Sequence, residues 1–184
     1  VPVRYHTPAV WYFVVVIIGA AACFGLNGLL NMSGMTAEYA EQMEYLNLLL
    51  YSAPLWLQIL CTGILAPLAE EMVFRGLVFK RMRTYLHFWP AAIASSLIFG
   101  IYHGNMLQLL YAGLLGLAMA FIYEQFRNIL APILFHVSAN LLSVLISNIP
   151  ELTQIFNGQN GTLYYMIATA VCVVTAVSLL WLMQ

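Results

Sequence analysis

Two adjacent glutamates and an arginine are the side chains of this sequence with the clearest chemical potential. Glu70 and Glu71 precede Arg75 in a stretch that is otherwise apolar. An ionised side chain at the centre of a membrane helix costs at least about 2.5–3.5 kcal/mol on insertion scales, so charges placed there indicate a function. Glu71 and Arg75 are four residues apart on one helix face, which predicts a supporting ion pair. Glu70 projects about 100° away from Glu71, which leaves it free to act as a general base.

Two histidines and an asparagine supply the remaining parts of a hydrolytic site. His103 follows Phe99 by one helical turn, and Asn140 follows His136 by one turn, so that His136 and Asn140 point the same way. We expect Glu70 and His103 to hold and deprotonate a water. His136 and Asn140 are expected to donate hydrogen bonds to the oxyanion that forms when a peptide carbonyl is attacked. This set predicts peptide hydrolysis without a side-chain nucleophile.

The same atoms permit a second interpretation, which includes a metal. Glu70, His103 and His136 are residue types that bind zinc, with a water in the fourth position. Their spacing does not match the His-Glu-x-x-His helix motif. We therefore favour no cofactor and keep zinc as the alternative. The three cysteines lie in separate apolar runs and predict neither a disulfide framework nor a zinc ribbon.

The composition places these residues inside a lipid bilayer. Hydrophobic residues make up 63% of the 184 residues and charged residues 7%, whereas a soluble domain carries about a quarter charged residues. The net charge of −1 provides no basic surface for a nucleic acid, so the bilayer is the expected partner. Long uncharged runs predict one all-α domain over 1–184, a polytopic bundle of about six transmembrane helices. The predicted spans are 8–30, 47–69 with an extension to 79, 89–104, 106–126, 129–148 and 161–183.

Charged residues between these spans predict the topology. Five of the six Lys and Arg residues, all except Arg75, fall on one side of the bilayer if the spans alternate, and the positive-inside rule makes that side, with both termini, cytoplasmic. They are Arg4, Lys80, Arg81, Arg83 and Arg127. Glu38, Glu41 and Glu44 fall on the other side, where residues 36–46 form either a short interfacial helix or a solvated loop.

The third and fourth spans carry three further expectations. Gly104-Asn105 divides a long apolar run into two helices, and Asn105 is close enough to His103 to line the site. Glu124 and Arg127 predict a surface ion pair. Small residues at four-residue spacing let a neighbouring helix approach the fourth span closely; they are Ala112, Gly116 and Ala120.

The three motifs together resemble the CPBP family, which comprises CAAX proteases and bacteriocin-processing enzymes and is also called the Abi family. Its pattern is Glu-Glu-x-x-x-Arg, Phe-x-x-x-His and His-x-x-x-Asn in this order, and residues 45–150 carry all three. The resemblance implies an intramembrane endopeptidase in which Glu70 matches the residue that activates water together with the one matched by His103. It places the oxyanion site at His136 and Asn140. Members are described both as metalloproteases and as metal-independent glutamate proteases, so the zinc alternative stays open.

The resemblance also bears on size, origin and substrate. Members often have about eight helices, so this chain, which begins with a valine, is expected to lack one or two helices at its start. Eukaryotic members trim prenylated C-terminal tails, whereas bacterial members are associated with peptide maturation, bacteriocin self-immunity or regulation. The small, Met-rich chain is typical of a bacterial cell-membrane protein, with a membrane protein or peptide as its substrate.

Three alternatives compete with proteolysis. In a proton-coupled transporter, Glu70, His103 and His136 would form a proton relay, but the inverted repeats that transporters commonly show are not visible in the sequence. In a non-catalytic bacteriocin-immunity protein or membrane partner, loss of Glu70 and His103 would be tolerated. In the structural alternative, Glu70 and Glu71 only bracket Arg75 at a helix end near the headgroups.

Overall fold

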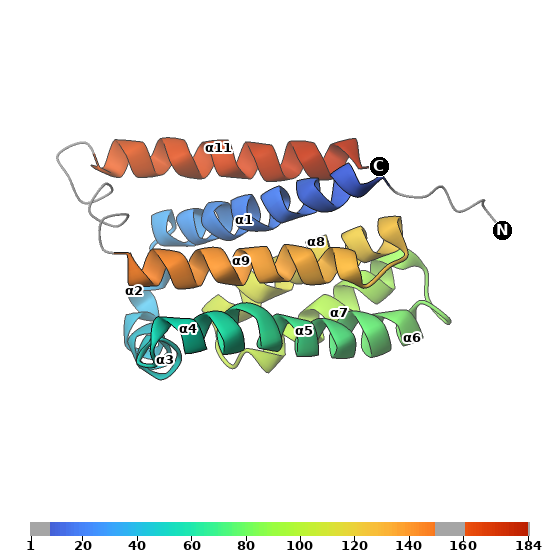
Figure 1. The fold of residues 1–184 in the computed structure, drawn as a ribbon, viewed down its shortest axis with the longest axis horizontal. Helices are drawn as coiled ribbons and strands as arrows, with labels where there is room; N and C mark the ends of the chain where they lie inside the picture. The colour runs from blue at the N-terminus through green and yellow to red at the C-terminus, as the bar shows by residue number, and fades with distance from the viewer. Residues whose placement is uncertain (1–7, 150–160, 184) are drawn as a thin grey trace.

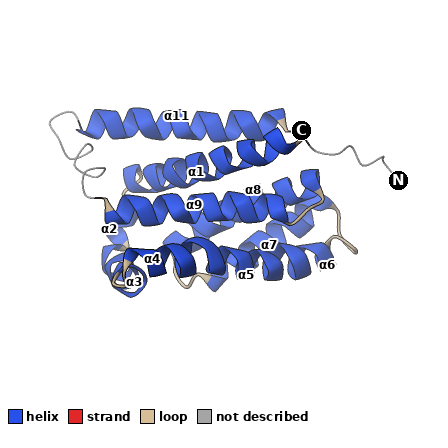
Figure 2. Cartoon of the chain, in the orientation of Figure 1, coloured by secondary structure: helices blue, strands red, loops and turns tan. Residues whose placement is uncertain are grey.

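The described part of the chain, residues 8–149 and 161–183 of a computed structural model, is built from helices and contains no strand (Figures 1 and 2). This confirms the predicted all-α class. The helices are α1 (Ala9–Met32), α2 (Met35–Glu38), α3 (Ala40–Tyr51), α4 (Leu55–Gln58), η1 (Ile59–Leu65), α5 (Ala66–Glu71), η2 (Met72–Phe79), α6 (Lys80–Met82), α7 (Phe88–Tyr102), α8 (Met106–Phe126), α9 (Leu130–Asn148) and α11 (Gly161–Leu182).

Among the described residues, five helices are long and apolar enough to cross a membrane. They are Ala9–Met32, Leu55–Met82, Met106–Phe126, Leu130–Asn148 and Thr162–Leu182. The remaining predicted span, 89–104, is α7, which is equally apolar but has only 15 residues. The predicted helix boundary at Gly104 is confirmed, because Gly104 has a φ of 92° and separates α7 from α8.

The second predicted span began in the wrong place. Residues 47–51 belong to α3, which Figure 1 shows end-on while the long helices run across the view. Pro54 then caps the next helix, because proline has no N–H to continue α3 and restricts the residue before it. The span therefore runs from Leu55 to Met82 and includes the predicted extension. Of the two forms considered for residues 36–46, the helix is observed, as α2 and the start of α3.

The helix from Leu55 to Met82 is not regular. It consists of five consecutive segments, α4, η1, α5, η2 and α6, in which η1 and η2 are π-helical. Glu70 and Glu71 lie in α5, between the two π-helical segments. Wide turns of this kind are frequent at functional sites, and they shift the side chains that follow relative to a regular helix.

Small residues allow the helices around this span to pack closely. Ala112, Gly116 and Ala120 of α8 are all buried, in agreement with the predicted small-residue stripe. A Cβ on Gly116 would lie 3.1 Å from Ser96 Cβ on α7, and a Cβ on Gly100 would lie 2.6 Å from the Leu109 carbonyl oxygen. On the other side of the bundle, α1 lies between α9 and α11 (Figure 1).

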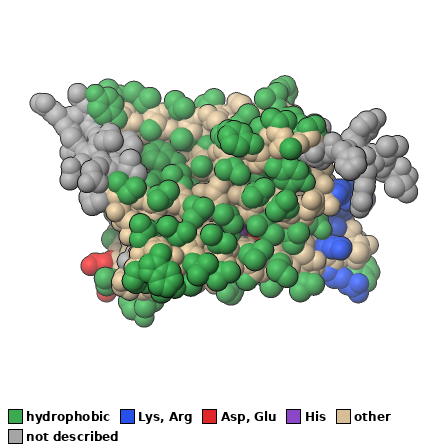
Figure 3. Space-filling model, viewed as in Figure 1, with side chains coloured by type: hydrophobic (Ala, Val, Ile, Leu, Met, Phe, Trp, Pro, Cys, Tyr) green, Lys and Arg blue, Asp and Glu red, His purple; other side chains and the backbone are tan. Residues whose placement is uncertain are grey.

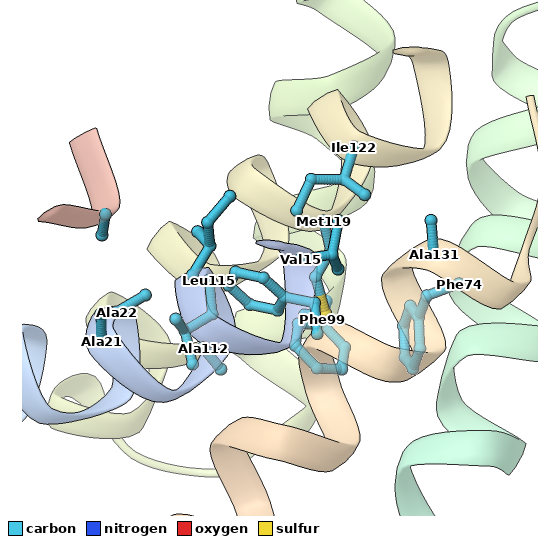
Figure 4. Close-up of a cluster of buried hydrophobic side chains, with 13 residues drawn as sticks. Val15, Ala21, Ala22, Phe74, Phe99, Ala112, Leu115, Met119, Ile122 and Ala131 are labelled. Carbon is cyan, nitrogen blue, oxygen red and sulfur yellow. The ribbon is translucent and has the colours of Figure 1, made fainter. Parts of the chain in front are cut away.

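The main hydrophobic core joins α1, α7, α8 and α9 (Figure 4). It is formed by fully buried side chains, including Val15, Phe99, Met119, Ile122 and Phe135. Phe74 of η2 packs edge-on against Phe99 with a centroid distance of 4.9 Å, so the core extends to the irregular helix. Burial of these apolar side chains fixes the helices that carry the candidate site.

Charged side chains gather at opposite ends of the bundle. In the space-filling view, Lys and Arg lie at the end where Figure 1 places α6, and acidic side chains lie at the end with α3 (Figure 3). The basic end includes Lys80 and Arg81 of α6, and the acidic end includes Glu41 and Glu44 of α3. Arg4 and residues 150–160, between the last two predicted spans, lie outside the described residues.

Candidate catalytic site

Glu71 and Arg75 form a fully buried ion pair. Arg75 Nη1 donates to Glu71 Oε1 at 2.8 Å, and the side chains are 2% and 0% exposed. Arg75 Nη2 also donates to the Gly116 carbonyl oxygen at 3.0 Å, and the guanidinium lies 4.6 Å from the centroid of the Phe99 ring. The carboxylate, the carbonyl dipole and the ring face each offset part of the cost of burying the cation. Arg75 thus joins the irregular helix to α7 and α8.

Glu71 has a second partner, which the sequence did not indicate. Its Oε1 lies 3.0 Å from His136 Nδ1 on α9. A carboxylate only accepts hydrogen bonds, so Nδ1 carries the hydrogen and donates the hydrogen bond to Glu71. This bond fixes the ring orientation, and in the neutral form of the imidazole it leaves Nε2 with a free lone pair. Glu71 therefore orients His136 in addition to pairing with Arg75.

Glu70 lies beside His136. Its Oε2 lies 3.6 Å from His136 Nε2, and its side chain is 20% exposed, whereas Glu71 is completely buried. The distance is longer than a direct hydrogen bond, but a water can reach both atoms at once. The two neighbouring glutamates consequently differ in role: Glu71 holds one edge of the His136 ring from inside, and Glu70 faces the other edge at a partly open position.

His103 reaches the interior because α7 is short. At about 1.5 Å per residue, the 15 residues of α7 extend roughly 22 Å from the basic end, and Glu70 lies roughly 18 Å along its helix from Met82. His103 caps α7, and its Nδ1 lies 2.8 Å from the Phe99 carbonyl oxygen. A full-length span would have carried this imidazole still further past the depth of Glu70.

Phe99 connects the two imidazoles. Its ring lies edge-on to His103 at a centroid distance of 4.7 Å and edge-on to His136 at 5.7 Å. Phe99 therefore belongs to the wall of the site, and it also lies beneath the Arg75 guanidinium. The Phe-x-x-x-His spacing in the sequence places Phe99 next to His103. The contact between Phe99 and His136 depends on where the fold places α7 relative to α9.

Asn140 does not point its amide freely into the site. Its Nδ2 donates to the carbonyl oxygen of Thr62, in η1, at 2.9 Å. Asn140 and His136 still share a face of α9, as expected from their spacing, and both contact the irregular helix. The amide nitrogen that was expected to donate to the oxyanion therefore already donates to a backbone carbonyl oxygen.

A groove at the acidic end leads to His103. It has a volume of about 490 Å³ and lies between α3 and the turn that joins α7 to α8. The turn contributes His103, Gly104 and Asn105, so Asn105 lines the approach to the histidine as expected. Asn105 also caps α8, because its Oδ1 accepts a hydrogen bond from the Gln108 backbone N–H at 2.8 Å.

The residues expected to hold zinc do not form a ligand set. Within residues 8–149 and 161–183, no three His, Cys, Asp or Glu side chains come together as a metal site. Glu70 Oε2 lies 3.6 Å from His136 Nε2, but within the described part of the chain His103 does not join them in a group of three ligands. A zinc site needs three protein ligands at about 2.0–2.2 Å from one point, so this arrangement of Glu70, His103 and His136 does not fit the ion.

Sequence reasoning missed three groups at the site. They are the carbonyl oxygen of Gly116, the carbonyl oxygen of Thr62 and the phenyl ring of Phe99 in its contact with Arg75. The small-residue stripe in α8 was a signal for close approach to Gly116 but not for a polar contact. The expected pair of Glu124 with Arg127 is formed at 2.7 Å, and Arg83 is an unexpected second partner of Glu124 at 2.8 Å.

Comparisons with known proteins match the region that contains the candidate site to a known family. Residues 52–142 match the family described as "Type II CAAX prenyl endopeptidase Rce1-like". The chain is 34% identical over 89 residues to a Bacillus subtilis (strain 168) protein named "Putative membrane peptidase YdiL", a match that covers 48% of this chain and 36% of that protein. It is 35% identical over 94 residues to an "Uncharacterized 24.3 kDa protein" of Escherichia coli, covering 48% and 43%.

The matched region contains every candidate residue. The chain spans less than half the length of the two curated relatives, and no solved structure matches it. Residues 52–142 include both glutamates, Arg75, both histidines and Asn140. With its apolar helices the chain is an integral membrane protein, and the match over residues 52–142 supports its membership of the CPBP family.

Proposed function

We propose that this protein is an intramembrane endopeptidase that hydrolyses peptide bonds of membrane-embedded proteins or peptides. The observation that carries the proposal is the arrangement of Glu70 Oε2 3.6 Å from His136 Nε2, with His136 Nδ1 held by the buried Glu71. A carboxylate and an imidazole lone pair at this separation can hold one water between them. Water held in a fixed position beside a base is what peptide hydrolysis without a side-chain nucleophile requires.

The reaction follows from these positions. Glu70 takes a proton from the water while the water oxygen attacks the peptide carbonyl carbon. The C–N bond then breaks as Glu70 passes the proton to the departing amide nitrogen, so the carboxylate is regenerated. We assign the water to Glu70 and His136, and not to Glu70 and His103, because His136 is the imidazole that lies beside Glu70.

His103 acts from the side of the groove. Its Nδ1 is bound to the Phe99 carbonyl oxygen at 2.8 Å, which leaves Nε2 for the substrate. When protonated, this nitrogen donates to the oxyanion of the tetrahedral intermediate. A peptide that enters between α3 and the α7–α8 turn meets His103 in the lining of this groove.

The charge distribution supports an orientation in the membrane. Lys80, Arg81, Arg83 and Arg127 lie at the basic end, which we place in the cytoplasm by the positive-inside rule (Figure 3). The first residue of α1 and the last residue of α11 lie at this same end in Figure 1. The groove beside His103 then opens at the opposite face, and the setting is a bacterial cell membrane.

The proposal is tested with purified protein in proteoliposomes, incubated with a library of membrane-derived peptides and analysed by mass spectrometry. Glu70→Gln keeps the size of the side chain but removes the base, so cleavage should fall by about 10²–10⁴-fold. Glu124→Gln is the matched control, since it changes another glutamate of the bundle at a distance from the site. Cleavage by Glu70→Gln at the rate of the unmodified protein would exclude Glu70 as the base.

The same assay decides between a metal-dependent and a metal-independent reaction. We expect cleavage to survive incubation with a chelator, because Glu70, His103 and His136 do not form a zinc ligand set. Loss of cleavage that added zinc restores would contradict this expectation.

A non-catalytic immunity partner is distinguished by an experiment in cells. Such a protein would still protect the host when both Glu70→Gln and His103→Ala are present.

A further inference from the structure

The irregular helix contains a carbonyl group that its own backbone cannot satisfy. In η1 the hydrogen bonds span five residues, and the last of them runs from the Ala66 N–H to the Cys61 carbonyl oxygen. The next bond in this series would run from residue 67 to the carbonyl oxygen of Thr62. Residue 67 is a proline, which has no N–H to donate. A backbone carbonyl in an apolar environment then needs a donor from elsewhere.

Asn140 supplies that donor. Its Nδ2 lies 2.9 Å from the Thr62 carbonyl oxygen, in the position where the backbone N–H of residue 67 would otherwise act. Gly63 makes the approach of α9 possible, because a Cβ at this residue would lie 2.6 Å from Leu141 Cδ2. Two consecutive residues of α9 therefore contact two consecutive residues of η1. Asn140 binds Thr62, and Leu141 packs against Gly63.

Two polar links consequently join α9 to the irregular helix. Asn140 binds the Thr62 carbonyl oxygen on one side of Pro67, and His136 binds Glu71 at 3.0 Å on the other side. His136 and Asn140 are one turn apart and share a helix face. A wide π-helical turn next to a proline is a place where a helix bends easily. The Asn140 link holds that place against α9, and thereby holds Glu70 beside His136.

We infer that Asn140 is a positioning residue that replaces the missing N–H of Pro67 and so sets the separation of Glu70 from His136. This inference rests on the proposed function, in which these two groups hold the reacting water. It assigns Pro67, Thr62 and Gly63 to the machinery that positions the site. It also differs from a direct role of Asn140 at the oxyanion, for which Pro67 would be irrelevant.

A double-mutant cycle between Asn140 and Pro67 tests the inference. Pro67→Ala restores an N–H that can bond to the Thr62 carbonyl oxygen, so Asn140 is no longer needed there. In the unmodified background, Asn140→Ala should lower kcat by about 10–100-fold with KM nearly unchanged, as expected when reacting groups move by about 1 Å. In the Pro67→Ala background, the same substitution should lower kcat by less than about threefold.

The cycle has outcomes that overturn the inference. An equal fold-loss of kcat in both backgrounds would assign Asn140 directly to the oxyanion. An unchanged kcat in Asn140→Ala would remove it from the site altogether. If Asn140→Ala does not fold, Asn140→Leu fills the same space without a donor and is used in its place. Rates are referred to the folded fraction, so that a loss of folded protein is not counted as a loss of kcat.

Thermal unfolding in detergent gives a measurement that does not depend on activity. The shifts in Tm caused by Asn140→Ala and Pro67→Ala should be strongly non-additive, because both act on the Thr62 carbonyl oxygen. Ser138→Ala is the matched control: its hydroxyl donates within α9 to the Phe135 carbonyl oxygen at 2.7 Å, so its effect should be additive with Pro67→Ala. Additive Tm shifts for Asn140 and Pro67 would overturn the inference even if the protein proves to be no protease.

Discussion

Two carboxylates in this bundle each bind two basic side chains, in very different surroundings. Glu71 contacts Arg75 at 2.8 Å and His136 at 3.0 Å, where none of the three side chains is more than 6% exposed. Glu124 contacts Arg83 at 2.8 Å and Arg127 at 2.7 Å, and its partners are 26% and 67% exposed. The distances are nearly the same. The environment, and not the contact geometry, decides what each cluster contributes.

The buried cluster is the one whose members cannot be changed singly. Removing one partner of a buried pair leaves a charge without compensation in a low dielectric, which costs far more than the intact pair contributes. At the Glu124 cluster, water and ions replace a lost partner. The Glu124 carboxylate also raises the pKa of Arg83, so this guanidinium stays charged at every ordinary pH. The charge of Arg83 is therefore lost only above that raised pKa, and salt is the practical means of weakening the pair near neutral pH.

The largest expected effect comes from Arg75→Met. This substitution leaves Glu71 buried without its cation, and breaking such a pair costs about 3–5 kcal/mol. We expect the free energy of unfolding in detergent to fall by this amount. Arg127→Met, at the exposed cluster, should change it by only about 0–1 kcal/mol. Equal losses in the two variants would show that burial does not distinguish the clusters.

A smaller effect is expected from Gly116→Ala. The added methyl group would lie 3.2 Å from Arg75 Nη2 and 3.1 Å from Ser96 Cβ, and overpacking of this kind costs about 1–3 kcal/mol. Gly113→Ala is the control on the same helix, since its Cβ would lie 3.7 Å from the Ser96 carbonyl oxygen, an ordinary contact. It should be neutral or gain up to about 1 kcal/mol from helix propensity. Thermal unfolding of both variants checks whether the Arg75 environment is tightly packed.

The smallest effect concerns salt. Glu124→Gln should lower the free energy of unfolding by at most about 1 kcal/mol, and the difference should shrink when the salt concentration rises to 1 M, where the Debye length is about 3 Å. The loss in Arg75→Met should not depend on salt, because the cluster around Glu71 is sealed from solvent. A salt-dependent effect of Arg75→Met would mean that ions reach Glu71, and the comparison of the two clusters would fail.

Local sequence patterns predicted several features correctly. The ion pair of Glu71 with Arg75 and that of Glu124 with Arg127 both follow from spacings of one helical turn. The boundary between α7 and α8 at Gly104 followed from the residue type. The start of the second span was wrong by eight residues, 47 instead of Leu55, because an interfacial helix such as α3 carries almost the same apolar residues as the start of a span.

The amino-acid sequence by itself determined the class of this protein, the bilayer as its solvent and the helix faces on which its polar residues lie, since these depend on composition and on neighbours within one turn. The tertiary structure alone decided which polar groups meet. The contacts of Arg75 with Gly116, of Glu71 with His136 and of Thr62 with Asn140 join residues 41, 65 and 78 positions apart. Periodicity gives each side chain a direction but not a partner on another helix, because the partner depends on how closely small residues let the helices pack.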